Sequence, residues 1–161
     1  MSEPLETPFL GEAEFRAALD AVIATASHEI RIFDHNLERM MLGESARADS
    51  LAAFLAGSIV RRLHIVVHHP DHAETRCPRL STLIRRFPNS IEVKETSAEL
   101  KHISDCFLLA DQAYGVIRFH RDHARGKLLQ NAADEIRPWW QRFDELWRSA
   151  SPCLAPTQIG L

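Results

Sequence analysis

Histidines and acidic side chains gather in one stretch of the chain, at residues 100–123, whose sequence is LKHISDCFLLADQAYGVIRFHRDH. His102 precedes an apolar run that ends at Asp111, and a second apolar run ends at His120 and His123. Imidazoles and carboxylates are the side chains that most often move protons or attack an electrophile in enzymes. The pattern therefore raises the question of whether this stretch forms the strand of an active site.

A second group of histidines follows another apolar run, in the sequence VVHHPDHAETRC. Imidazole and thiolate are ligands that zinc prefers, and loops at the carboxyl ends of parallel strands commonly hold ligands. However, the spacing matches no standard zinc site, and adjacent side chains of an extended segment point to opposite sides. We expect polar loop side chains here, with zinc or another transition metal, or a small anion, as the alternatives. The metal-ligand candidates are His68, His69, His72 and Cys77.

Composition excludes several classes of protein. The 161 residues are 45% hydrophobic and 25% charged, which is typical of a soluble globular protein. A formal net charge of −3 disfavours a general nucleic-acid binder, which normally carries a basic face. The acidic N-terminus does not resemble a secretory signal, and no apolar run is long enough to cross a membrane. The three cysteines are unpatterned, so we expect free thiols and a cytoplasmic location.

Hydrophobic periodicity predicts the elements that must position these groups. The first part of the chain alternates helical and strand patterns, which indicates an α/β fold with a mostly parallel sheet. The predicted helices cover residues 12–26, 46–60 and 80–87, and the predicted strands cover residues 29–33, 63–67 and 91–95.

The pattern changes after residue 95. CFLLAD and YGVIRF are predicted to form an antiparallel hairpin over residues 106–119, and KLLQ at 127–130 is a candidate for a further strand. A last helix is predicted over 137–150, with Pro138 at its first position, where a missing N–H costs nothing. We predict a single domain over residues 1–161, with a core at about 12–150 and an irregular tail at 151–161. The last helix carries the aromatic residues Trp139, Trp140, Phe143 and Trp147.

This order of elements resembles one repeat of the phospholipase D-like superfamily, over residues 12–150. The resemblance rests on the segments ATASHEIRIF and LAAFLAGSIVRRLHIVV, on the hairpin, and on Phe143 and Trp147 in the closing helix. It implies an α/β phospholipase D-like half-domain: a mixed, mostly parallel sheet flanked by helices, with a hairpin and a C-terminal Trp-rich helix. It also implies a bacterial protein without a bound cofactor that pairs with a second copy, and Trp139 or Trp140 could serve that homodimer.

The catalytic signature of that superfamily is HxKxxxxD on the first strand of the hairpin. Two copies of the signature face each other: one histidine forms a phosphohistidine, the other protonates the leaving group, and the lysines hold phosphate oxygens. If Asp111 is the motif aspartate, Ser104 and Cys106 stand at the histidine and lysine positions. If His102 is the motif histidine, Ser104 and Leu109 stand at the lysine and aspartate positions. Either alignment keeps one motif residue of three.

The alignment on Asp111 fits better, because CFLLAD ends on an aspartate before a turn. The Gly-Ser pair that the superfamily places after this aspartate is replaced by Ile117 and Arg118. The resemblance therefore implies a degenerate motif.

Three functions remain open. The leading hypothesis is a catalytically inactive accessory or interaction module that keeps a weak anion-binding site, with a homodimer and a further protein partner possible. Degenerate domains of this kind occur beside acetyltransferase domains in bacteria, which would suit such a role. The first alternative is a divergent phosphodiesterase or nuclease that uses His102, His120 or Asp111, and the second is a metal-binding domain. The anion-binding candidates are His102, Ser104, His120, Arg121 and His123.

Overall fold

The computed structural model describes residues 3–156 of the chain. They form an eight-stranded sheet with the strand order β1-β7-β6-β5-β2-β3-β4-β8. The strands are β1 (Leu5–Leu10), β2 (Glu29–Asp34), β3 (Arg62–Val67), β4 (Ile91–Glu95), β5 (Cys106–Ala110), β6 (Tyr114–His120), β7 (His123–Gln130) and β8 (Ser151–Cys153). The helices are α1 (Glu12–Thr25), α2 (Ser45–Ala56), α3 (Asp71–Arg76), α4 (Pro78–Arg86), the 3-10 helix η1 (Ala98–Leu100) and α5 (Ala133–Ser149).

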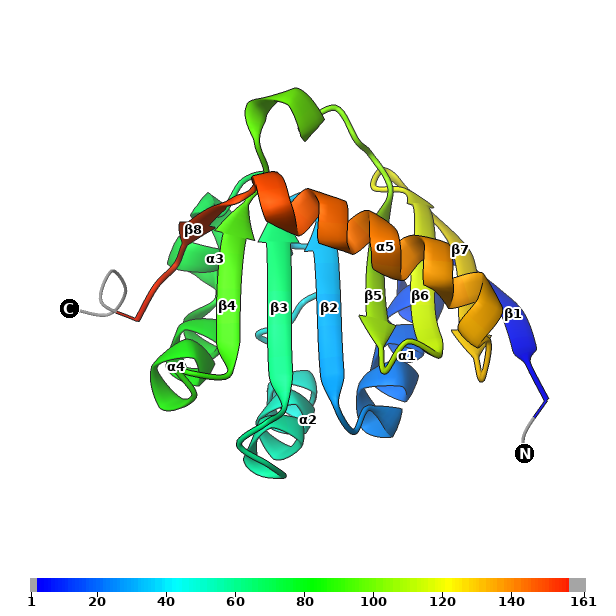
Figure 1. Ribbon diagram of the computed structural model, residues 1–161, viewed down its shortest axis with the longest axis horizontal. Helices are drawn as coiled ribbons and strands as arrows, with labels where there is room; N and C mark the ends of the chain where they lie inside the picture. Colours follow the sequence, from blue (N-terminus) through cyan, green and yellow to red (C-terminus); the bar gives the residue numbers. More distant parts are fainter. Residues whose placement is uncertain (1–2, 157–161) are drawn as a thin grey trace.

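The sheet separates two hydrophobic cores. Helices α1 to α4 pack against one face, and α5 crosses the other face, where it runs across the strands (Figure 1). Strand side chains alternate between the faces, so β5 sends Cys106 and Leu108 into the first core and Phe107 and Leu109 into the second. Every residue of β5 is buried as a result, which explains why its sequence is an unbroken apolar run.

The predicted α/β fold is confirmed, with its mixed sheet, its flanking helices, its hairpin of β5 and β6 and its Trp-rich last helix. The prediction of a mostly parallel sheet is wrong. In the described residues, only β2 with β3 and β3 with β4 pair in parallel, and the other five pairings are antiparallel. The alternating helices and strands up to residue 95 predict only the parallel part of the sheet. The hairpin strands and both edge strands add antiparallel pairs that this alternation does not include.

Two strands, β1 and β8, and two helices, α3 and the 3-10 helix η1, lie outside the predicted elements. Strand β1 pairs with β7 and lies before the predicted core, and β8 pairs with β4 inside the tail that we predicted to be irregular. Both are edge strands, and their prolines, Pro8 and Pro152, are tolerated there because an edge strand pairs on one side only. Helix α3 forms in the segment VVHHPDHAETRC, where we expected a polar loop. Residues 157–161 of the predicted tail lie outside the described residues.

The last helix begins at Ala133 rather than at residue 137, and Pro138 lies inside it. The prediction that Pro138 occupies the first helical position is therefore wrong. The extra turn forms because Ile136 is fully buried in the second core and Asp134 and Glu135 bring negative charge to the helix N-terminus. Within residues 3–156, the structure contains no helix whose length and apolarity would suit a membrane span.

Candidate functional site

Side chains capable of chemistry meet at one end of the sheet. β5 runs antiparallel to β2, so the start of β5 lies beside the end of β2. β6 is antiparallel to β5, and Arg118 near its end is paired with Cys106. Asp34 and His68 stand at the ends of the parallel strands β2 and β3, which is where α/β sheets commonly bind ligands. We call Glu12, Asp34, His68, Cys106 and Arg118 the strand-end cluster.

Arg118 is the central cation of the strand-end cluster. Its side chain is 1% exposed, and its Nη1 and Nη2 atoms donate to the two carboxylate oxygens of Glu12 at 2.7 and 3.0 Å. Nε also donates to the carbonyl oxygen of His120, and Nη2 donates to that of Arg121. The bond to Arg118 holds the pKa of Glu12 below its ordinary value, although burial acts in the opposite direction. This guanidinium is therefore engaged by internal partners and is not available to an anion.

Asp34 and Cys106 are neighbours in the cluster. Asp34 is 5% exposed and accepts a hydrogen bond of 2.7 Å from the backbone N–H of Leu37. Cys106 is 1% exposed, and burial together with the neighbouring Asp34 carboxylate raises the pKa of its thiol far above the ordinary value. A thiol that stays protonated is a poor nucleophile, so Cys106 acts as a small buried side chain.

His68 is also held by internal contacts. Its side chain is 1% exposed, Nε2 lies 2.7 Å from the carbonyl oxygen of Ile103, and Nδ1 lies 2.9 Å from the hydroxyl of Thr96. Burial lowers the pKa of this imidazole. A neutral ring with its proton on Nε2 donates to the carbonyl of Ile103, and Nδ1 lies beside a Thr96 hydroxyl whose single proton also faces the carbonyl oxygen of Val67 at 3.0 Å. His68 thus ties the end of β3 to the segment that connects β4 and β5.

The predicted anion-binding residues are brought together in part. Residues 120–123, which we call the histidine turn, connect β6 to β7, and Arg121 donates its backbone N–H to the carbonyl oxygen of Ser104 at 2.8 Å. The rings of His120 and His123 lie 5.2 Å apart. His102 lies after η1 with an exposed side chain.

A small polar cavity of about 140 Å³ lies beside the histidine turn. Arg39 forms part of its wall, donates to the carbonyl oxygen of Arg121 and lies 3.4 Å from the carboxylate of Asp122. Burial, and secondly the charge of Arg121, lower the pKa of His35. The cavity therefore offers guanidinium donors beside a neutral imidazole. It is lined by Asp34, His35, Asn36, Glu38, Arg39 and Arg121.

Asp111 lies at the other end of β5, away from the other two catalytic candidates. Its carboxylate accepts the backbone N–H groups of Ser27, His28 and Glu29 at 2.8 to 3.0 Å. Burial raises its pKa, but these hydrogen bonds outweigh burial and lower it overall. Asp111 thus ties the hairpin to the start of β2. The structure does not bring Asp111 together with His102 or His120.

The four metal-ligand candidates do not converge either. His68 is engaged as described above, and the exposed His69 packs its ring against His35 at 4.8 Å. His72 lies on α3, and Cys77 is buried at the junction of α3 and α4. In the part of the chain that the structure describes, no group of three or more histidine, cysteine or acidic side chains could hold a metal ion.

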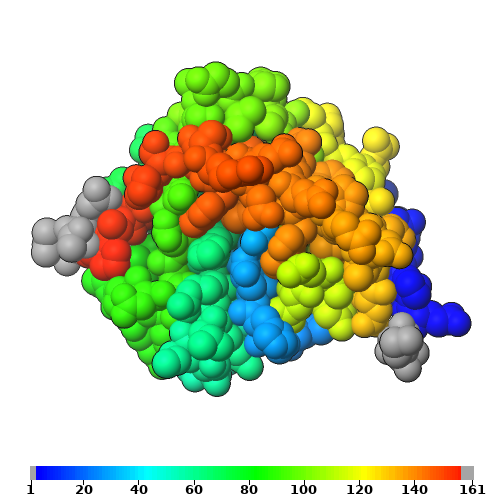
Figure 2. Space-filling view, in the orientation of Figure 1, coloured from blue at the N-terminus to red at the C-terminus, as the bar shows by residue number. Residues whose placement is uncertain are grey.

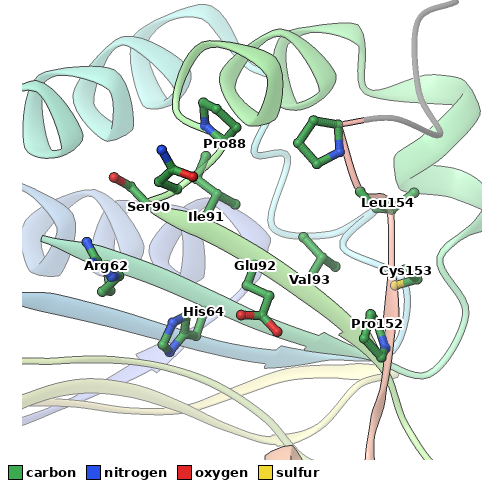
Figure 3. A pocket seen from close by; sticks show the side chains of 13 residues that line it. Arg62, His64, Pro88, Ser90, Ile91, Glu92, Val93, Pro152, Cys153 and Leu154 are labelled. Carbon is green, nitrogen blue, oxygen red and sulfur yellow. The ribbon is translucent and has the colours of Figure 1, made fainter. Parts of the chain in front are cut away.

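A separate cavity of about 330 Å³ lies between β3, β4 and residues 152–156 (Figure 3). Arg62, His64 and Glu92 point toward it from the sheet. His64 stacks on Trp147 with 4.6 Å between ring centres, and burial lowers its pKa. Figure 2 shows this part of the sheet beside α5, where the helix leaves the strands uncovered. Cys153 also lines the cavity, and burial raises the pKa of its thiol to about 12, so it stays protonated near neutral pH.

Sequence reasoning missed most of the strand-end cluster. Glu12 and Arg118 are 106 positions apart, and a solvent-exposed first turn of a helix is the usual place for a glutamate. The signal that could have found the pair is Arg118 itself, a charged residue inside the apolar run YGVIRF, because a charge in a buried strand requires a partner.

Comparison with protein families and with solved structures agrees with this fold. The family model described as "Domain of unknown function (DUF7931)" matches residues 11–156. Comparison with curated proteins found no match. Among solved structures, the chain is similar to the phospholipase D family member Nuc from Salmonella typhimurium, with 13% identity, a TM-score of 0.64 and coverage of 94% of this chain and 99% of Nuc.

Two further structures share the fold. NucT from Helicobacter pylori is 13% identical, with a TM-score of 0.63 and coverage of 94% of this chain and 100% of NucT. TrmBL2, described as an archaeal chromatin protein with a novel mode of DNA binding, is 10% identical, with a TM-score of 0.68 and coverage of 92% of this chain and 53% of TrmBL2. The fold is thus that of the phospholipase D-like superfamily, and the chain belongs to the DUF7931 family.

Proposed function

We propose that this chain is a catalytically silent binding module that keeps the phospholipase D-like fold without its phosphodiesterase chemistry. The proposal rests on the strand-end cluster, whose reactive side chains are held by internal partners. Its cation, Arg118, is bound to Glu12 and to two carbonyl oxygens, its imidazole, His68, is bound on both ring nitrogens, and its thiol, Cys106, is protonated.

The motif positions support the same conclusion. With Asp111 as the motif aspartate, the nucleophile position holds Ser104 and the phosphate-holding position holds the buried Cys106. A serine hydroxyl is a weak nucleophile unless an adjacent base activates it, so Ser104 is a poor substitute for the motif imidazole. Removing one preorganised charge donor from a site of this kind costs about 10²–10³ in rate, and here several are replaced together.

We assign the anion binding that this chain retains to the histidine turn. Arg121, His120 and His123 present donors on one turn, and Arg39 reaches the same turn from the loop after β2. Asp122 offsets part of this charge, so we expect weak binding of inorganic phosphate or a similar small anion. Nucleic acid is disfavoured by the net charge of −3, although TrmBL2 is described as binding DNA.

A divergent phosphodiesterase that uses His120 or His102 is the rival, and His120 has the better position because it lies in the histidine turn. We also propose a homodimer, a protein partner and a cytoplasmic location for this single domain. Trp139 and Trp140 are half-buried against the second core, where Trp140 stacks under Arg31 at 3.9 Å. They are therefore largely engaged within the chain, and the dimer needs other side chains as well.

The test is hydrolysis of bis(p-nitrophenyl) phosphate by purified protein, with and without a chelator. His120→Ala and His102→Ala variants run beside the wild type, because each removes one candidate nucleophile and also reveals a contaminating enzyme. The proposal expects no release of nitrophenol above buffer in any sample. Release that survives the chelator and disappears in one variant would establish the rival and identify its histidine.

A further inference from the structure

A larger cleft lies on the sheet face that α1 to α4 cover, and it shares Glu38 and Arg39 with the small cavity beside the histidine turn. Its volume is about 660 Å³, within the range of about 300–1,000 Å³ that small-molecule sites occupy. Three parts of the chain form its walls: the start of α1, the loop of residues 35–44 between β2 and α2, and the junction of α3 and α4. It is lined by Glu12, Arg16, Glu38, Arg39, Met41, Gly43, Glu44, His72, Arg76, Cys77, Pro78 and Arg79. We call it the arginine cleft.

Positive charge exceeds negative charge in the arginine cleft. The lining includes four arginines and three glutamates. Glu12 is already compensated by Arg118 behind it, Glu44 lies 3.3 Å from the buried Arg47, and among the arginines only Arg39 lies near a carboxylate outside the cleft, that of Asp122 at 3.4 Å, in the described residues. Arg76 and Arg79 are exposed beside the cleft, and neither is bound to a carboxylate in the described residues. Guanidinium groups bind phosphate and carboxylate oxygens with paired hydrogen bonds, so the charge favours an anion.

Two helices begin at this cleft. Glu12 is the first residue of α1, and Pro78 is the first residue of the nine-residue α4, preceded by Cys77 at its N-cap. The positive end of a helix dipole favours anions, and two such ends lie near the arginines. At α4 the cap position has no side-chain hydrogen bond, and the first turn contains no acidic residue. The field of α4 is therefore not compensated by its own side chains.

The wall formed by residues 35–44 is held rigidly. Leu37, Met40 and Leu42 are fully buried, and Leu37 and Met41 have φ values of 68° and 49°. Such left-handed conformations persist in residues other than glycine only where the surroundings enforce them, and they concentrate at functional sites. Arg47 supplies part of this constraint, because its Nη1 donates to the carbonyl oxygens of Met40 and Met41 at 3.1 and 3.0 Å.

The two walls are joined across the cleft. Nη1 of Arg79 donates to the carbonyl oxygen of Gly43 at 2.9 Å. Apolar surface completes the lining: Met41 is 45% exposed, and Cys77 is buried between the walls. Burial raises the pKa of the Cys77 thiol, so it contributes apolar surface rather than charge. The cleft thus combines donors for an anionic group with a place for an apolar group.

From this geometry we propose that the arginine cleft binds a small phosphate ester with an apolar substituent, its phosphate held by Arg76 and Arg79 at the start of α4 and its apolar group against Met41. This site does not depend on anion binding at the histidine turn. It requires no reaction, and neither Arg76 nor Arg79 belongs to the strand-end cluster.

The test is a titration of ¹⁵N-labelled full-length protein with phenyl phosphate, followed by amide chemical shifts. Parallel titrations use inorganic phosphate, which lacks the apolar group, and benzyl alcohol, which lacks the charge. We expect saturable shifts at residues 41–44 and 76–80, with weaker binding of inorganic phosphate and none of benzyl alcohol. Saturable shifts confined to residues 120–125 would overturn the cleft site while supporting the anion site of the histidine turn. An absence of any saturable shift would overturn both.

Variants separate a specific site from general attraction. An Arg76→Ala/Arg79→Ala protein should bind phenyl phosphate at least about tenfold more weakly, since charge-assisted hydrogen bonds are lost. Arg85→Ala/Arg86→Ala is the matched control, because it also removes two positive charges, from the opposite end of α4, and it should bind within about twofold of wild type. Equal weakening in both proteins would overturn the proposal.

A second variant blocks the cleft without removing charge. A Cβ atom added at Gly43 would meet only Cys77, at an ordinary contact distance of 3.8 Å, so Gly43→Leu should fold and fill the cleft. We expect it to abolish saturable binding of phenyl phosphate, with the amide spectrum outside the cleft unchanged. Wild-type affinity in this variant would contradict the assignment.

Discussion

The dependence of Arg118 on Glu12 can be measured directly. Glu12→Gln removes the negative charge while it keeps the shape of the side chain, which leaves the 1% exposed guanidinium without its anion. Removing one partner of a fully buried ion pair costs about 3–5 kcal/mol of the free energy of unfolding. The Glu12 side chain is 42% exposed, so water can replace part of the lost interaction. We therefore expect a loss of about 2–3 kcal/mol.

The assay is urea unfolding of four proteins: wild type, Glu12→Gln, Arg118→Met and the double variant. If the two side chains interact as described, the double variant should lose less stability than the sum of the single variants, by about 1–3 kcal/mol. Glu14→Gln is the matched control, because it removes a second charge from the first turn of α1 and keeps an acceptor for the backbone N–H of Leu10. It should change stability by about 0.5 kcal/mol or less.

The contribution of Glu12 to the free energy of unfolding should decrease as the pH falls. The folded-state pKa of Glu12 lies below its ordinary value of 4.5. A depressed carboxyl pKa stabilises the protein above the unfolded-state pKa, and this contribution disappears as the pH falls through the folded-state pKa. The stability difference between wild type and Glu12→Gln should thus shrink between about pH 6 and pH 3. The reasoning is refuted if Glu12→Gln and Glu14→Gln are equally stable at neutral pH, because Arg118 would then not need Glu12.

Three further predictions concern the other buried polar groups. Asp111→Ala should reduce the free energy of unfolding by about 1–3 kcal/mol, because it leaves backbone N–H groups at the start of β2 without an acceptor, and urea unfolding measures this loss. His68→Leu should cost about 1–3 kcal/mol in the same assay and increase hydrogen exchange in residues 97–103, whose connection to β3 is lost. Cys106 should react with a thiol reagent only at the rate of global unfolding, since its thiol is buried and protonated; rapid labelling of the folded protein would contradict that description.

The fold could be predicted to a large extent because its central strands carry strong local signals. The apolar runs of β3 and β5 are long enough to indicate strands buried on both faces, and the short connection between β5 and β6 indicates a hairpin. The edge strand β1 carries no such signal, because only Phe9 of its six residues is buried. Its place is determined by pairing with β7, more than a hundred positions away, and local periodicity contains no information on such pairing.

The candidate site could be predicted only where its residues are neighbours in sequence. The histidine turn was visible because His120, Arg121 and His123 lie within four positions. The arginine cleft and the strand-end cluster depend on long-range contacts, such as the bond from Arg79 to Gly43. The alignment of Asp111 with the motif aspartate stays a prediction from the resemblance, whereas its contact with the start of β2 follows only from the pairing of the strands.

The central claim has two parts: this chain binds small phosphates, and it does not hydrolyse them. One sample can test both parts. Wild-type protein is titrated by calorimetry with bis(p-nitrophenyl) phosphate in the presence of a chelator, and ³¹P NMR spectra of the same sample are then recorded over a day. The account predicts weak, saturable binding and a single unchanged phosphodiester signal. A growing phosphomonoester signal that is absent with the His120→Ala protein would contradict it and would show that the site catalyses hydrolysis.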